Sequence, residues 1–453
     1  MTREPSELDK VADAWVDKMA ELSPSFATYI GRKGSDHLLD DPSPEAVEEH
    51  LAESKKFHAQ VKAAPVADKV DEVTKAAMLA NFELNEELHD SGVWKRDLDV
   101  ISSPAQGIRD IFDLSPTDSV EAWENLTKRM NSVPEAIDGY IRTLRLGIEA
   151  GDTPAKRQVE FNIKMTEGIA AADGFFNKFA ASAKAGDSEL PESLKADLVA
   201  AGHAATEGYA KLLEFFKGDM LENANSVDAI GRERYALFSR KFLGAKIDLD
   251  ETYEWGREEL ARVTAEQIAV ADEIKPGATV AEAIEVLNND SSRKLHSKDE
   301  LQKWMQRLSD NAIEKLNGTH FDIAEPLRKL ECMIAPTNSG VIYYTGPTDD
   351  FSRPGRMWWS VPDGVNEFDT WRETTTVYHE GVPGHHLQVA QATYIRETLN
   401  AWRRLSSWTS GHGEGWALYA ERLMEELGFL SNPADRLGML DGQRMRAARV
   451  VLD

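Results

Sequence analysis

Cysteine, basic charge and long apolar runs are scarce in this 453-residue chain. Its single cysteine, Cys332, excludes an internal disulfide framework and every zinc module that is built on several cysteines. Lysine and arginine number 52 against 78 aspartates and glutamates, so the formal net charge is −26. Because phosphate binding needs concentrated Lys and Arg, this balance argues against nucleic acid and anionic membranes as partners.

Targeting and membrane signals are lacking too. Residues 1–8 (MTREPSEL) contain no basic stretch followed by an apolar run, so the sequence predicts no signal peptide. No run of roughly 18 apolar residues predicts a transmembrane helix, and no tract has low complexity. We therefore expect a cytoplasmic protein. With 42% hydrophobic residues, 11 Trp and 16 Phe, the chain can bury a substantial core.

Most of residues 1–330 shows helical periodicity. Residues 44–63 place their apolar side chains in one stripe, with charges opposite. Asp118 is a candidate N-cap, with Glu121 three residues further on. Further helical segments are predicted over 153–185, 190–219, 226–242, 249–274, 278–288 and 297–317.

The pattern changes after about residue 330. Two short runs that favour strands, 340–345 and 356–361, are separated by turns rich in Pro, Gly and Asp. These runs predict a small antiparallel β ribbon within a mainly α protein, and helices resume at about residue 368.

Histidines are concentrated in the C-terminal third. Four of the 11 fall within 34 residues, in the segments 379–388 (HEGVPGHHLQ) and 411–421 (GHGEGWALYAE). Zinc peptidase helices of the H-E-x-x-H type place two imidazoles one turn apart, with the Glu as general base. His379 and Glu380 supply the first half of this pattern. Position 383 is a proline, which cannot bind metal, so the next imidazole is that of His385.

Helix geometry decides what this longer spacing requires. Six residues of α-helix advance about 9 Å and 240°, whereas two zinc-bound nitrogens lie only a few ångströms apart. A two-residue bulge at the intervening glycines and proline would restore the one-turn relation. His386 faces nearly the same side as His379 but lies about 10.5 Å along the axis. We therefore favour His385 as ligand and His386 as its supporting neighbour. The alternative is a loop that carries surface histidines.

The second segment offers a third ligand. Glu414 is flanked by two glycines, which is typical of a carboxylate that closely approaches another element. Glu421, two turns later, is a candidate acceptor for the hydrogen bond of a ligand imidazole. The alternative is that both belong to a solvated acidic stripe on one helix face. His412 is a candidate donor to an oxyanion or substrate. The alternative is that it only lies at the start of the helix.

These two motifs resemble those of the bacterial family called domain of unknown function 885. Similarity extends over nearly the whole chain, through 23–31 (SPSFATYIG), 235–248 (YALFSRKFLGAKID), 253–256 (YEWG) and 350–355 (DFSRPG). That family is grouped by similarity with zinc metallopeptidases of the gluzincin kind. The resemblance implies a mainly α, metallopeptidase-like body with the ribbon beside a metal site, and peptidase activity.

The resemblance also implies a domain organisation. Residues 1–330 would form a helical cleft wall, and residues 331–453 the ribbon and the helices of the metal site. Family members usually continue past this point with helices that close the cleft, so we expect the C-terminal part of the family fold to be absent. Apolar residues near the end of the chain, including Met445 and Leu452, predict a tendency to form homo-oligomers.

The expected chemistry is metal-assisted hydrolysis of peptide bonds. One Zn²⁺ held by His379, His385 and Glu414 would keep a fourth position for water and lower the pKa of that water to about 7. Glu380 would accept the water proton and pass it to the leaving amine.

Substrate contacts are predicted at four further positions. The strand at 340–345 would pair with an extended peptide by strand addition. Arg353 would pair with a substrate carboxylate, or else fix its own loop. Tyr344 and Tyr419 are candidate oxyanion donors, with packing as the alternative.

The competing interpretation is a helical peptide-binding protein without catalysis, which keeps a degenerate metal site. A purely structural zinc site is disfavoured because such sites are mostly rich in cysteine and closed.

Overall fold

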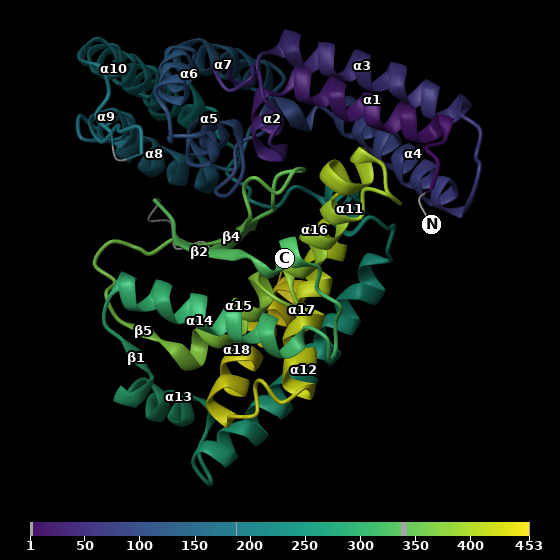
Figure 1. Cartoon of the computed structure of the whole chain (residues 1–453), viewed down its shortest axis with the longest axis vertical. Helices are drawn as coiled ribbons and strands as arrows, with labels where there is room; N and C mark the ends of the chain where they lie inside the picture. The colour runs from purple at the N-terminus through teal and green to yellow at the C-terminus, as the bar shows by residue number, and fades with distance from the viewer. Residues whose placement is uncertain (1–2, 187, 337–341, 453) are drawn as a thin grey trace. The chain divides into compact units, whose positions relative to one another are not determined.

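The computed structural model describes residues 3–186, 188–336 and 342–452. The predicted mainly α fold is confirmed, with 67% helix and 5% strand. Contacts divide the chain into two compact units (Figure 1). The first comprises Met1–Arg232 and Glu397–Ser406, and the second comprises Glu233–Arg396 and Ser407–Asp453. The composition change near residue 330 therefore falls inside the second unit.

The regular elements that the structure describes in the first unit are helices. Its elements are α1 (Glu7–Leu22), α2 (Pro24–Ile30), α3 (Pro44–Ala63), α4 (Lys69–Asp90), η1 (Val93–Arg96), α5 (Pro104–Leu114), α6 (Val120–Asn131), α7 (Val133–Glu149), α8 (Lys156–Ala170), α9 (Phe175–Ala181), α10 (Glu192–Phe215), η2 (Phe216–Met220) and η5 (Trp402–Ser406). Helix α10 packs against α6, α7, α8 and α9 around one apolar core. A second core joins α1 to α4 with η5.

Local signals account for where several of these helices begin and end. Helix α3 has the predicted bounds, with Ser43 as its N-cap. Helix α6 begins one residue later than predicted, because Ser119 and not Asp118 accepts the capping hydrogen bond, from the Ala122 N–H. The predicted segment 153–185 is broken between α8 and α9. At Gly174 a Cβ would lie 2.3 Å from the Ile169 carbonyl oxygen, so the chain turns sharply there.

The second unit combines helices with short strands. Its elements are α11 (Arg232–Leu243), α12 (Leu249–Ile274), α13 (Val280–Asn288), η3 (Ser291–Arg293), β1 (Lys294–Leu295), α14 (Lys298–Leu316), η4 (Glu325–Arg328), β2 (Leu330–Ile334), β3 (Ile342–Thr345), β4 (Gly355–Trp359), β5 (Phe368–Asp369), α15 (Thr370–Glu380), α16 (His385–Tyr394), α17 (Ser410–Glu426) and α18 (Pro433–Leu452).

The predicted ribbon is confirmed within the described residues. Strands β3 and β4 pair antiparallel, with Ile342 opposite Trp359. Residues 340 and 341 of the predicted first strand lie outside the described residues. Strand β2 pairs in parallel with the other side of β4, so the sheet has the order β2-β4-β3 and β3 lies at an edge. The sequence did not predict this third strand.

Helix α15 is at the centre of the second unit. It packs against α14, α17 and α18, and α18 packs in turn along α12 (Figure 1). The fully buried Trp371 of α15 belongs to the core that these helices share.

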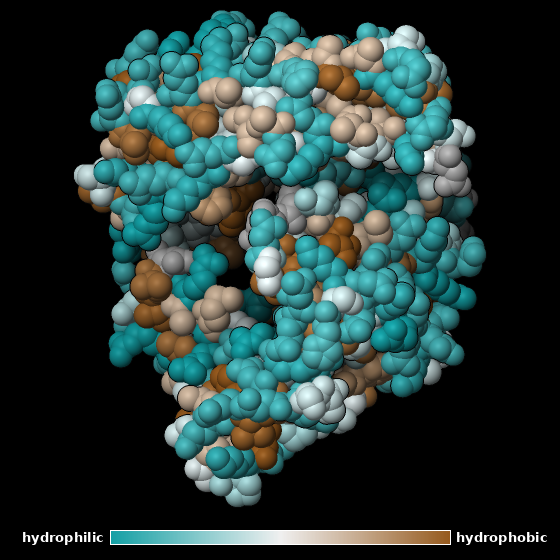
Figure 2. Space-filling view, turned by 90° about the vertical axis from the view of Figure 1, so that its left-hand side faces the viewer, coloured by the Kyte–Doolittle hydropathy of each residue, from teal (hydrophilic) through white to brown (hydrophobic). Residues whose placement is uncertain are grey.

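On the face seen in Figure 2, hydrophilic residues predominate and hydrophobic ones form separate small patches.

Close packing at one glycine holds α18 against α15. A Cβ at Gly438 would lie 2.2 Å from the carbonyl oxygen of Trp371, whereas at Gly442, one turn later, it would meet only the end of the Arg446 side chain. We predict that Gly438→Ala lowers the free energy of unfolding by about 1–3 kcal/mol, because the helices must separate.

The matched control is Gly442→Ala, which we expect to be neutral or stabilising by up to about 1 kcal/mol because alanine favours a helix. Thermal and urea denaturation of both variants measures the difference. Equal stabilities would contradict the packing argument.

Candidate metal centre

The two predicted ligand histidines lie on either side of a helix break. Helix α15 ends at Glu380, directly after His379, and α16 begins at His385. The expected two-residue bulge is therefore replaced by a complete interruption over residues 381–384, in which the Val382–Pro383 peptide bond is cis.

Glycine is required at the end of this break. A Cβ on Gly384 would lie 1.9 Å from the carbonyl oxygen of His379 and 2.5 Å from that of Tyr378. The Gly384 N–H donates to this Tyr378 carbonyl at 3.1 Å. The start of α16 thus lies directly against the end of α15, a close approach that only glycine allows.

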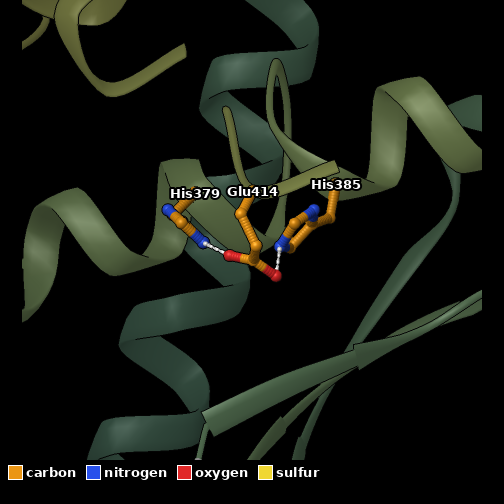
Figure 3. Close-up of side chains that lie close together, drawn as sticks. All are labelled: His379, His385 and Glu414. Carbon is orange, nitrogen blue, oxygen red and sulfur yellow. Dashed lines mark ion pairs between the residues drawn. The ribbon is translucent and has the colours of Figure 1, made fainter. Parts of the chain in front are cut away.

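This arrangement brings His379, His385 and Glu414 together (Figure 3). The Nε2 atom of His379 is 3.3 Å from Oε2 of Glu414, and Nε2 of His385 is 3.5 Å from Oε1 of the same carboxylate. One donor atom from each of the three residues lies within 4.8 Å of the others. The imidazoles meet edge to face, with 4.8 Å between ring centroids.

Both imidazoles are buried, with 4% of His379 and 6% of His385 exposed. His386 is 1% exposed. The histidines are therefore not surface residues, although residues 381–384 do form the loop of that alternative.

Glu421 orients the first imidazole. Its buried carboxylate accepts hydrogen bonds from the His379 Nδ1–H and from the Thr375 hydroxyl, each at 2.8 Å. A carboxylate only accepts, so the proton of neutral His379 is on Nδ1 and the Nε2 lone pair points toward Glu414. Glu421 is not part of a solvated stripe, because it lies on the buried face of α17.

Charge complementarity dominates the electrostatics of this cluster. Burial lowers the pKa of His379, but hydrogen bonds with Glu414 and Glu421 outweigh burial and raise it to about 9. Hydrogen bonds with His379 and His385 hold the pKa of Glu414 well below its usual range. Without a metal, the proton on His379 therefore takes the place of a bound cation.

His386 has a different environment from His385. Its Nε2–H donates to the carbonyl oxygen of Leu327 at 2.8 Å, and its Nδ1 accepts from the Tyr344 hydroxyl at 2.9 Å. Burial lowers the pKa of His386 to about 4, so the ring is neutral. Gly355 leaves room for this pair, because a Cβ there would lie 2.3 Å from the Tyr344 hydroxyl oxygen. Both ring nitrogens thus serve to connect α16 to β3 and η4.

Glu380 is buried beside the two histidines. Its side chain is 6% exposed, and among the described residues its Oε2 has no hydrogen-bond partner. Burial raises the pKa of Glu380, while the charges of His379 and His385 oppose that rise. The carboxyl therefore has a free oxygen and a raised proton affinity next to the cluster.

The other predicted residues are not in the cluster. The exposed His412 has its Nε2 3.5 Å from the Gln388 side-chain nitrogen. Arg353 closes its own loop through its backbone, since its N–H donates to the Thr348 hydroxyl at 3.1 Å. Tyr419 is 53% exposed and its ring lies 5.9 Å from that of Trp416.

Sequence reasoning missed three residues that support the site. Thr375 lies one helical turn before His379, a spacing that could have indicated it. Trp416 donates from Nε1 to the Pro383 carbonyl oxygen at 2.8 Å and so joins α17 to the helix break. The indole of Trp408 lies 6.0 Å from the His385 ring, and no sequence signal indicated this contact.

Comparison with known proteins identifies the family. The profile of a family described as bacterial protein of unknown function, DUF885, matches residues 24–453. The chain belongs to the DUF885 family. No curated protein gives a significant match to this DUF885 chain.

Two solved structures share the fold. Both are described as putative lipoproteins, the second as one of unknown function. The protein from Colwellia psychrerythraea has a TM-score of 0.82 at 20% identity, and the one from Shewanella oneidensis has 0.66 at 19%. In each case the match covers 98% of this DUF885 chain and 82% of the other. Within the part of this chain that the structure describes, no helix is both long and apolar enough to cross a membrane.

The hydrogen bond from His379 to Glu421 yields a prediction for the metal-free protein. We expect Glu421→Gln to lower the pKa of His379 from about 9, because the variant removes a negative acceptor. A raised pKa stabilises the fold below the unfolded value of about 6.5, and this contribution is lost as pH rises through about 9. The stability difference from wild type should therefore be largest below pH 6.5 and disappear above pH 9.

Glu425→Gln is the matched control, because Glu425 lies one turn further along α17 and pairs with Arg422. Histidine NMR titration and thermal denaturation across this pH range measure both effects. A His379 pKa that stays near 9 in Glu421→Gln would contradict the assignment.

Proposed function

We propose that this protein is a zinc-dependent peptidase in which His379, His385 and Glu414 bind the metal. The convergence of two buried imidazoles and one carboxylate carries the proposal. Two histidines and a glutamate form a recurrent ligand set of catalytic zinc sites, which keep a fourth position open. We also propose that the DUF885 family is related to zinc peptidases of the gluzincin kind.

The donor atoms lie near the separation that zinc requires. Tetrahedral bonds of about 2.0–2.2 Å place neighbouring ligand atoms about 3.3–3.6 Å apart. The Nε2–Oε distances of 3.3 and 3.5 Å from the histidines to Glu414 fall in this range, each to a different oxygen of the carboxylate. One donor atom from each residue lies within 4.8 Å of the others, so zinc would draw the three donors closer together. Glu421 also supports a zinc site, because ligand histidines generally donate their second N–H to a carboxylate or carbonyl.

Zinc in this position would polarise the scissile carbonyl and lower the pKa of a bound water to about 7. Glu380 would take the proton of that water with its unpartnered oxygen and deliver it to the leaving amine. Its raised pKa suits this exchange, since a base that holds the proton too weakly cannot pass it on.

Peptides are the proposed substrates. Strand β3 lies at the edge of the sheet and carries Tyr344, which connects it to α16, so a peptide added there would run close to the histidines. Arg353, Tyr419 and His412 are proposed as outer contacts for substrate groups.

Removal of ligands tests the metal site. We expect wild type purified without chelator to contain one zinc per chain, and His379→Ala with Glu414→Ala to bind it much more weakly. The zinc affinity should fall by more than about 10- to 100-fold, which is the cost of removing a residue that only supports a ligand.

Elemental analysis and competition with a chromophoric chelator measure stoichiometry and affinity, with Glu425→Ala as control. Unchanged affinity in the double variant would refute the site.

A second prediction separates catalysis from binding. Glu380→Gln should keep the zinc and lose peptide hydrolysis by at least about 100-fold, because it cannot accept the proton. Hydrolysis of a mixed peptide library followed by mass spectrometry, beside zinc analysis, measures both.

Retained turnover in Glu380→Gln, or loss of zinc, would contradict this role. A wild type that binds zinc and peptides without turnover would instead favour the non-catalytic binding protein.

A further inference from the structure

We propose that Trp408 forms the wall of a subsite for a bulky apolar side chain beside the candidate metal centre. Preferred substrates would then be peptides with an aromatic or large aliphatic residue next to the scissile bond. This inference rests on the proposed function and names the substrate class of the same site.

Trp408 combines exposure with closeness to a proposed ligand. It lies just before the N-cap of α17, and 52% of it is exposed. Its ring centroid is 6.0 Å from that of His385, and the Tyr344 ring lies 6.5 Å from the same imidazole. Aromatic faces near a reactive centre contribute apolar contact that is gained only when a ligand covers them.

A glycine keeps the indole in this place. At Gly413 a Cβ would lie 2.0 Å from the far end of the Trp408 ring, so the ring occupies the space that a side chain would need. Gly415, on the other side of Glu414, has nothing within 4 Å of the same position. The two glycines that flank the carboxylate therefore differ, and only Gly413 is needed for the position of the indole.

Other apolar groups lie at the same end of α17. The backbone of Leu243 lies 3.0 Å from the Cβ position of Gly411, and Phe242 precedes it at the end of α11. Leu243 is 43% exposed and Phe242 is 53% exposed. An acidic substrate side chain would lose its hydration against these apolar groups without gaining a partner, which is costly for a charged group.

Three short peptide hydroxamates test the subsite, because the hydroxamate group itself binds zinc and no turnover is needed. They carry a benzyl, a methyl or a carboxymethyl side chain next to that group. We expect the zinc-loaded protein to bind the benzyl probe about 10- to 100-fold more tightly than the methyl probe, the range for burying an aromatic side chain. The carboxymethyl probe should bind most weakly.

Two pairs of variants assign this preference to Trp408. Trp408→Ala should bring the benzyl and methyl affinities together, with Ile268→Ala, another exposed apolar residue of the second unit, as control. Gly413→Ala should have the same effect by displacing the ring, whereas Gly415→Ala should keep the preference. Calorimetry measures probe affinity, and elemental analysis checks that each variant keeps its zinc.

The outcomes separate the two proposals. Equal binding of the three probes by zinc-loaded wild type, or a preference that survives in Trp408→Ala, overturns the subsite and leaves the metal centre standing. A wild type that takes up no zinc and binds none of the probes overturns both.

Discussion

The candidate centre depends on the way the chain turns between α15 and α16. His385 lies six positions after His379, and a continuous helix would point their imidazoles in different directions. The interruption at residues 381–384 ends one helix and starts the next against its last carbonyl groups, an approach that leaves no room for a side chain at Gly384. The two rings meet because the helix stops.

Two contacts from α17 hold this turn in place. Trp416 donates to the Pro383 carbonyl oxygen, and Glu421 accepts from His379. Two turns of the same helix separate Glu421 from Glu414. One helix therefore supplies the carboxylate of the cluster, the acceptor that orients the first imidazole, and the anchor for the backbone break. The buried Trp371 and the close contact at Gly438 hold α15 against α18.

Burial makes the charges of this centre interdependent. A buried ion is costly unless it is paired and hydrogen-bonded, and Glu421 meets that requirement with two donors. The side chain of Glu414 remains 51% exposed, so it can adjust to a cation without leaving a buried charge unpaired. The similar structures, at 20% and 19% identity, establish the fold alone, and any chemistry must be argued from these residues.

The sequence alone determined the helical class, the bounds of α3 and the pairing of β3 with β4, because caps, turns and periodicity are local signals. It also singled out His379, His385 and Glu414, since few residue types bind metal. It could not decide that the helix would end rather than bulge, because that depends on how residues 381–384 pack against the last carbonyls of α15. It favoured His385 over His386 as the ligand only from helix geometry, because both side chains have the same chemistry. The tertiary structure gave their different environments, with both nitrogens of His386 bound to partners on η4 and β3 while His385 turned toward α17.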